Sequence, residues 1–274
     1  MAITTLDGVI AAASQRVGLL KIGSRSSLAA TPFSVFDLAG NPGAGVLAGT
    51  STTAGVVPTA ATVGCPTINA FGSGNTGYLN RIEFSNTVSG RLQLFDMLYK
   101  AGAYAFTAGT TTLSAQPSYS SRVLGGTDFT NTEVWIEVAV AFATGTAWQI
   151  NVTYTNQSGT AGRTAIISVA RNNGALIQGT MFQLALAAGD TGVQKIESVI
   201  VTNGGTAMTA GSVNVLVLRR LWQGRVRVAN DGDTHDMLKT GMPIVFVDSA
   251  FILVDIPDGV GTGAPEIVME IING

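Results

Sequence analysis

Strand-like segments separated by turn residues follow one another from residue 78 almost to the C-terminus. In Trp148–Thr155 polar and apolar residues alternate, which is the pattern of a strand with one buried face. Clusters of Gly, Asn, Asp and Ser, the residues that favour turns, lie in nearly every gap. Because these segments succeed one another without helices between them, the sequence predicts an all-β chain with a jelly-roll-like β-sandwich.

The expected strands share a composition rich in β-branched and aromatic residues, which pack well on a half-buried sheet. The short, glycine-containing connection 143–147 predicts a hairpin between the two strands that flank it. The expected strands are Arg91–Tyr99, Glu133–Phe142, Trp148–Thr155, Thr164–Val169, Met181–Ala187, Val193–Thr202, Ser212–Trp222, Pro243–Val247, Phe251–Ile256 and Glu266–Ile272.

The N-terminal segment has the pattern of a helix instead. Thr4 and Asp7 have the spacing of a capping box, in which each side chain satisfies a backbone N–H of the other residue. Apolar residues then recur every three or four positions as far as Val17, and Gly18 is a suitable stop. The sequence therefore predicts a short N-terminal helix with one apolar face.

A long stretch from Gly40 to Gly77 is rich in Gly, Thr, Ala and Pro and has no charged residue. This composition is too apolar for a solvated linker and too rich in glycine for a helix or a regular strand. We expect an extended arm that lies on another surface, either a sheet of this chain or that of a neighbour. The expected domains are thus residues 1–77, a helix and an extended arm, and residues 78–274, the β-sandwich.

Composition excludes several classes of function. Charged residues make up 12% of the 274 residues, against about 25% in a typical soluble domain, and a net charge of −2 argues against nucleic-acid binding. Cys65 is the only cysteine and His235 the only histidine, so neither a disulfide framework nor a thiolate metal cluster can form. We see no signal peptide and no apolar run of the ~18 residues that cross a bilayer. We therefore expect no cofactor, no membrane partner and a chain made in a cytoplasm.

Polar chemistry is concentrated in Asn230–Asp236, where Asp231, Asp233 and Asp236 are weak candidates for ligands of a hard cation such as Ca²⁺. The chain lacks the distal Glu of an EF-hand loop, and Asp-Gly is a strong turn signal, so a solvated turn is the favoured interpretation. Catalysis by His235 is the least favoured alternative.

A cluster of arginines beside a tryptophan is the other unusual feature. An Arg-rich strand with an aromatic residue suits a protein–protein interface, because both residue types are enriched there. An ordinary exposed strand and a nucleic-acid patch are the alternatives, and the negative net charge disfavours the second. The interface candidates are Arg219, Arg220, Trp222, Arg225 and Arg227.

Motifs of catalysis are weak or missing, so no catalytic residue is proposed. Gly72–Gly77 matches G-x-G-x-x-G, but a coil precedes it and a strand-like segment follows, whereas a dinucleotide site needs a strand and then a helix. Glu133 and Glu137 on one strand would lie about 13 Å apart, beyond the roughly 5–9.5 Å of glycosidase carboxylates. Trp135 and Trp148 could stack on sugars, although sandwich core is the simpler interpretation.

Three stretches resemble virion proteins of tailed bacteriophages: Met1–Ala11, Val152–Thr164 and Leu186–Gly192. The resemblance covers about an eighth of the chain and includes no active-site motif. It implies a non-enzymatic capsid decoration (cement) protein that binds the major capsid protein and is a homo-oligomer, with a trimer favoured. Such a protein is made in the host cytoplasm and lies on the capsid surface of the virion, with residues 1–77 in contact with the capsid or with sister subunits.

A tail or baseplate component is one alternative, and a carbohydrate- or receptor-binding virion module is another. The second would use Trp135, Trp148, Tyr154 or the Asp231–Asp236 segment. A polysaccharide-degrading enzyme is the third and weakest alternative.

Overall fold

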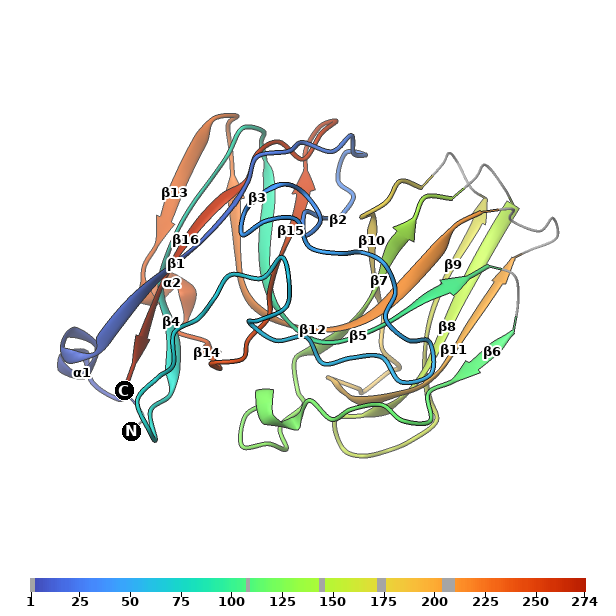
Figure 1. Cartoon of the computed structure of the whole chain (residues 1–274), viewed down its shortest axis with the longest axis horizontal. Helices are drawn as coiled ribbons and strands as arrows, with labels where there is room; N and C mark the ends of the chain where they lie inside the picture. Colours follow the sequence, from blue (N-terminus) through green and yellow to red (C-terminus); the bar gives the residue numbers. More distant parts are fainter. Residues whose placement is uncertain (1–2, 107–108, 143–145, 172–175, 204–209) are drawn as a thin grey trace. The chain divides into compact units, whose positions relative to one another are not determined.

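The computed structural model describes residues 3–106, 109–142, 146–171, 176–203 and 210–274. Its strands form three antiparallel sheets (Figure 1). The helical elements are short: α1 (Leu6–Ala11), η1 (Ser120–Arg122) and α2 (Met237–Thr240). An all-β, sandwich-like fold with one short N-terminal helix is therefore confirmed.

The first sheet, sheet A, has the strand order β13-β4-β16-β1-β3, with β14 also paired to β4. Its central strand, β16, pairs with β4 on one side and β1 on the other. The strands are β13 (Asp231–His235), β4 (Gly77–Asn86), β16 (Glu266–Asn273), β1 (Ala13–Lys21), β3 (Gly40–Asn41) and β14 (Ile244–Val245).

Sheet B has the order β10-β7-β12-β5-β15-β2, and sheet C the order β6-β11-β8-β9. The strands of sheet B are β10 (Met181–Leu184), β7 (Thr132–Val140), β12 (Ser212–Val226), β5 (Gly90–Ala105), β15 (Phe251–Pro257) and β2 (Phe33–Ser34). Those of sheet C are β6 (Thr110–Thr112), β11 (Val193–Asn203), β8 (Thr146–Asn156) and β9 (Arg163–Arg171).

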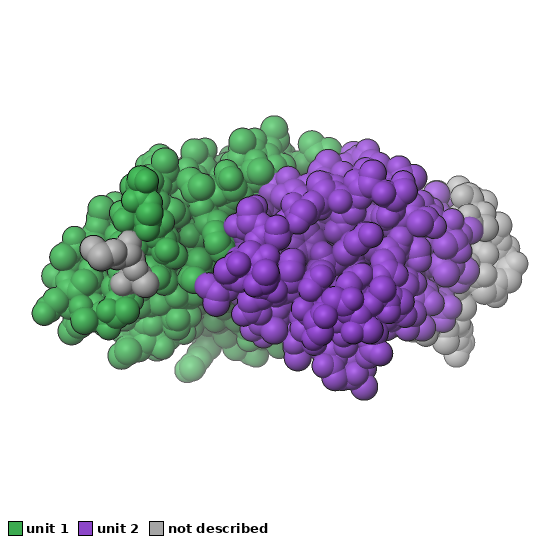
Figure 2. Space-filling model, turned by 90° about the horizontal axis from the view of Figure 1, so that it is seen from below, with its two compact units in different colours: residues 1–46, 59–96, 221–274 green, residues 47–58, 97–220 purple. Residues whose placement is uncertain are grey.

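The chain divides into two compact units, which Figure 2 colours separately. Unit 1 comprises Met1–Val46, Thr59–Asp96 and Leu221–Gly274, and unit 2 comprises Leu47–Pro58 and Met97–Arg220. This division does not follow the boundary predicted at residue 77. The reason is that β1, from before that residue, pairs with β16, from after it, so both belong to one sheet. The predicted role of residues 1–77 in partner contacts stays a prediction.

Each unit has a hydrophobic core of its own. The core of unit 1 contains Leu19 of β1, Ile82 of β4 and Met269 of β16, together with Leu92 and Leu253 of sheet B. Burying such apolar side chains contributes about 25 cal/mol per Å² removed from water. The alternation of buried and outward residues along these strands thus fixes which face of sheet A meets the core.

The core of unit 2 lies between β7 and β12 of sheet B and β8 and β11 of sheet C. Ile136 and Val215 face it from sheet B, and Ile150 and Val199 from sheet C. The predicted hairpin between the strands flanking residues 143–147 is therefore wrong: β7 pairs with β10 and β12, whereas β8 pairs with β11 and β9. Residues 143–145 of the connection lie outside the described part of the chain.

The N-terminal helix is shorter than the sequence predicts. Thr5 rather than Thr4 caps it, its hydroxyl accepting from the N–H of Gly8 at 3.1 Å, and the helix ends at Ala11. Val17, expected on the helix, lies instead in β1, where alternate residues are buried and the backbone pairs with β16. Strand pairing over this length outweighs a short isolated helix, which is marginal in water.

The glycine-rich arm lies on strands of its own chain. In unit 2, Val56 forms an isolated β-bridge with Lys100 of β5, and Gly102 donates to the carbonyl of Ser51 at 3.2 Å. Gly49 approaches β5 so closely that a Cβ there would lie 1.6 Å from the backbone nitrogen of Ala103. Glycine is therefore needed at this position because the two backbones touch.

Candidate interaction surfaces

Helix α1 exposes apolar side chains at the surface of unit 1. Leu6 is 57% and Ile10 74% exposed, and none of the six helical residues is buried. A hollow of about 700 Å³ lies beside the helix, lined by Ile3, Thr4, Thr5, Gly8, Ala11–Ala13, Ser73–Asn75, Asn273 and Gly274. A protruding apolar helix next to a hollow is a surface that a protein partner can cover.

The stretch that matches G-x-G-x-x-G forms part of the rim of this hollow. Asn75 donates to the carbonyl of Gly72 at 3.0 Å, which closes a turn, and β4 starts at Gly77. A strand thus follows the glycines, as the sequence predicts, whereas a dinucleotide site needs the N-terminus of a helix there.

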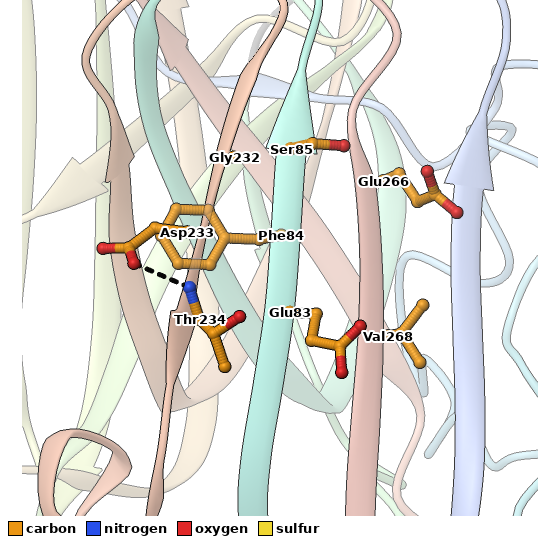
Figure 3. Close-up of a pocket in the computed structure, with 8 residues that line it drawn as sticks. All are labelled: Glu83, Phe84, Ser85, Gly232, Asp233, Thr234, Glu266 and Val268. Carbon is orange, nitrogen blue, oxygen red and sulfur yellow. Dashed lines mark hydrogen bonds between the residues drawn. The ribbon is translucent and has the colours of Figure 1, made fainter.

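A second, smaller pocket of about 320 Å³ lies on sheet A across β13, β4 and β16 (Figure 3). Its two rows of lining residues follow from the strand register: Gly232 and Glu266 flank Ser85, and Thr234 and Val268 flank Glu83. The row with glycine and serine has little side-chain volume, and the pocket forms there.

The polar groups of this pocket are engaged with neighbouring side chains. Glu83 Oε1 accepts an ion-pair contact from Arg16 at 3.0 Å and from Arg81 at 2.9 Å. Asp233 accepts from the N–H of Thr234 at 2.7 Å, the bond drawn in Figure 3, and that backbone bond lowers the pKa of Asp233. This pocket is therefore a polar depression on sheet A in which the carboxylates of Glu83 and Asp233 already have partners within the chain.

The candidate cation ligands lie in and after the edge strand β13. The favoured interpretation of Asn230–Asp236 as a turn holds only at its start, where the N–H of Asp231 donates to the carbonyl of Val228 at 3.2 Å. For the rest of the segment it is wrong, because Asp231–His235 pairs with β4 as a strand. Asp236 follows the strand and caps α2, accepting from the N–H groups of Leu238 and Lys239. Among the residues that the structure describes, no three His, Cys, Asp or Glu side chains are grouped to hold a metal ion.

His235 belongs to an aromatic cluster in unit 1 with Trp222 and Phe84. The indole Nε1 of Trp222 donates to His235 Nδ1 at 3.0 Å, and the Phe84 ring meets both other rings edge-on. Burial and, to a smaller extent, the charge of Lys239 lower the pKa of His235. The imidazole therefore serves as a neutral hydrogen-bond acceptor that fixes the indole.

The arginine cluster is divided between the two units. In unit 2, Arg220 pairs with Glu133 at 3.0 Å, and Arg219 is half-buried. In unit 1, Arg227 is exposed, and Arg225 is exposed and pairs with Asp258 at 3.1 Å.

Trp222 is only 4% exposed, so it packs in the core of unit 1 and does not lie on the surface as an interface residue would. The role of the four arginines in an interface stays a prediction.

The aromatic residues considered for sugar stacking are buried. Trp135 donates to Glu133 at 2.8 Å, Trp148 packs against Phe106 and Phe142, and Tyr154 lies in the core of unit 2. The interpretation of the tryptophans as core is confirmed. A carbohydrate-binding surface therefore cannot be built on these side chains.

Two features of these surfaces have no local signal in the sequence. The hollow beside α1 forms because β1 and β16 bring residues 11–13 next to residues 273–274, and no local pattern indicates this pairing. The strand β13 was missed because Asp and Gly dominate it, although alternate polar residues on an edge strand are a known way to block unwanted pairing.

No protein-family model matches the chain, and no curated protein matches it. Among solved structures it is similar to the infectious bursal disease virus VP2 subviral particle, with 11% identity over 95% of this chain and 79% of that one, at a TM-score of 0.26. It is also similar to the structure of the Gx strain of that virus, with 10% identity over 96% of this chain and 80% of that one, at a TM-score of 0.20. A third similar structure is that of the T=1 particles derived from the virus, with 12% identity over 95% of this chain and 76% of that one, at a TM-score of 0.19. These scores are too low to assign the fold or the function of this chain.

None of the described helices has the length and apolar character needed to cross a membrane.

Proposed function

We propose that this chain is a non-enzymatic structural protein of a virion, which binds and stabilises the lattice of a major capsid protein as a decoration (cement) protein. Three sequence stretches that resemble tailed-phage virion proteins support this proposal, as does a chain with few charged residues. In the proposed setting the protein is made in the host cytoplasm and sits on the capsid surface as a homo-oligomer, with a trimer favoured.

The exposed apolar helix α1 is the observation that carries the proposal. A side chain such as Ile10, 74% exposed on a helix with no buried residue, adds nothing to the stability of the isolated chain. Covering what remains exposed of Leu6 and Ile10 on assembly would contribute about 1–2 kcal/mol for each side chain. In this proposal α1 and the hollow beside it form the contact with the capsid lattice.

Substitution on α1 tests the contact. The double variant Leu6→Asp/Ile10→Asp changes only exposed side chains, so the chain should fold and its occupancy on purified shells should fall at least tenfold. Val260→Asp is the matched control, because Val260 is also exposed in unit 1 but lies away from α1 in the sequence. Undiminished occupancy of the α1 variant would rule out this contact.

Location in the particle tests the function itself. Cryo-EM of purified particles with the protein labelled should show it on the capsid surface, in a fixed ratio to the shell protein. Density at the tail or baseplate would instead support the alternative structural role and would contradict decoration.

A further inference from the structure

Three polar side chains are buried together in unit 2, on three neighbouring strands of sheet B. Lys100 is on β5, Asn214 on β12 and Glu137 on β7, and their exposed fractions are 4%, 0% and 1%. In the strand order, β12 lies between β7 and β5. Charged residues are almost never buried so completely without a specific reason.

Both nitrogen atoms of the cluster converge on one carboxylate oxygen. Glu137 Oε2 lies 3.5 Å from Lys100 Nζ and 3.1 Å from Asn214 Nδ2. Asn214 Nδ2 also donates to the carbonyl of Leu47 at 2.7 Å, which fixes the orientation of the carboxamide. The amine and the amide are therefore held against the same acid–base group.

The strand order and register place Asn214 between Glu137 on β7 and the strand β5 that carries Lys100. Asn214 is directly opposite Glu137 in the register of β12 and β7. On the β5 side its neighbour is Gly102, where a Cβ would lie 2.3 Å from Asn214 Oδ1. Lys100 is two residues away from Gly102 on β5 and so shares its face of the sheet. No side chain at position 102 separates Asn214 from β5.

We propose that Lys100 and Asn214 join in an intramolecular isopeptide bond, with Glu137 transferring the protons. The reaction is a transamidation in which Lys100 Nζ is the nucleophile and Asn214 Cγ the electrophile. It requires no oxidant, metal or second substrate, since both reacting groups belong to the folded chain.

The reaction balances as follows. Glu137 takes a proton from the ammonium of Lys100 and leaves a neutral amine beside a carboxylic acid. The Nζ lone pair attacks Cγ, forming the Nζ–Cγ bond and a tetrahedral centre. The Cγ–Nδ2 bond then breaks, Glu137 protonates the departing Nδ2, and ammonia leaves. The amine's second proton returns to Glu137 or leaves with the ammonia.

Burial favours each part of this sequence. Burial keeps water away from the reacting groups, and Glu137 is the acid–base group that both nitrogen atoms approach. Holding the amine and the amide against the same carboxylate oxygen lowers the entropic barrier of an otherwise very slow reaction. The chain has a single cysteine and hence no intramolecular disulfide, and the isopeptide bond would brace β5 to β12 by another covalent route.

Intact-mass spectrometry of the purified full chain tests the proposal. The bond releases one ammonia, so the measured mass should be about 17 Da below that of the sequence. Proteolysis should give a branched peptide that joins Lys100 to Asn214. A mass equal to that of the sequence, with no branched peptide after prolonged incubation, would overturn the proposal.

Ammonia is also lost when Asn-Gly forms a succinimide, and this chain has Asn-Gly at Asn173, Asn203 and Asn273. A succinimide gives a linear peptide and disappears in mild base, whereas the isopeptide bond survives it. A loss of ammonia that maps to these positions, with none at Asn214, would also contradict the proposal.

Variants assign the roles of the three residues. Glu137→Gln keeps the shape of the side chain but cannot move protons, so the full sequence mass should be recovered. Asn214→Asp should still form the bond, with loss of water (about 18 Da) in place of ammonia. Lys195→Arg, at an exposed lysine of unit 2, is the matched control and should leave the mass deficit unchanged. A deficit that persists in Glu137→Gln would exclude Glu137 as the proton-transfer residue.

Discussion

At the scale of single residues, Lys21 shows how one side chain can organise an irregular segment. Its ammonium donates to the carbonyls of Phe36, Leu38, Pro42 and Gly43, at distances of 3.1–3.2 Å. The side chain is almost fully buried, and burial lowers the pKa of Lys21. One buried cation thus lies against four carbonyls of the irregular segment that includes β2 and β3.

Lys21→Met should destabilise unit 1 by about 2–4 kcal/mol, because these carbonyls would lose their shared charged donor. Urea unfolding followed by circular dichroism measures the loss. Lys195→Met, at an exposed lysine, is the control and should shift the midpoint little. An equal shift in both variants would show that the carbonyl contacts contribute nothing specific.

Asp255 on β15 is a buried carboxylate whose pKa lies near neutral pH. It is fully buried, and this burial raises its pKa to about 7, although Asn86 donates to its carboxylate at 3.3 Å. Because the folded pKa exceeds the usual 3.8, the folded chain binds this proton more tightly than the unfolded chain does. The stability that Asp255 contributes is complete below about pH 4 and is lost as the pH rises through 7.

Asp255→Asn should remove this pH dependence. We expect the advantage of the variant over the wild type in free energy of unfolding to be about 2–3 kcal/mol larger at pH 8 than at pH 5. Chemical denaturation at both pH values measures the difference. Asp7→Asn, at an exposed carboxylate of α1, should show no such divergence. Parallel pH profiles for wild type and Asp255→Asn would contradict the assignment.

At the scale of elements, Asp190 clamps the loop before β11 to the β8–β9 hairpin. Its carboxylate accepts from Tyr154 at 2.6 Å, Asn156 at 2.7 Å and Arg163 at 2.8 Å. The bond from Arg163 is the main cause that lowers the pKa of Asp190 to about 2, while burial raises that of Tyr154 to about 12. One carboxylate thus ties together three segments of sheet C and its loops.

Asp190→Ala should free these three donors and destabilise unit 2 by about 2–4 kcal/mol. Amide hydrogen exchange should accelerate in residues 156–162 and 187–192, since the hairpin and the loop lose their common anchor. Asp128→Ala, at an exposed carboxylate that bonds only to Thr130, is the control. In the wild type the contribution of Asp190 should be present above about pH 4 and lost as the pH falls towards 2.

Most strands could be predicted because their pattern is local. Val193–Thr202 and Glu266–Ile272, for example, differ from β11 and β16 by one residue at the C-terminal end. Pairing could not be predicted in the same way. Alternation shows which residues share a face but not whether consecutive strands lie side by side or face each other across a core, as β7 and β8 do.

The candidate site residues show the same limit. Trp222 is of a residue type that is enriched in interfaces. In the structure it is buried instead, because it packs against Phe84 on β4 and His235 on β13. Lys100, Glu137 and Asn214 are more than 30 residues apart and form a cluster only through the order of three strands. Single-sequence patterns carry no signal for such contacts.

At the scale of the whole molecule, neither compact unit is one continuous piece of chain. A fragment of residues 78–274 lacks β1, β2 and β3, and with them buried residues such as Leu19, Lys21 and Phe33. We expect this fragment to lose the near-ultraviolet circular dichroism of a packed core and to bind a hydrophobic dye. A cooperative, dye-free fragment would show that the sheets close without the N-terminal strands.

The position of β16 between β1 and β4 has a consequence for synthesis on the ribosome. Residues 266–273 emerge after all other strands of sheet A, and until then β1 and β4 have no common neighbour. The segments of unit 2 end at residue 220, so its sandwich can close while unit 1 still waits for its central strand. During that interval the apolar faces of β1 and β4 are exposed to chaperones and to neighbouring nascent chains. Aggregation through these faces should therefore stop only when β16 has paired with both strands.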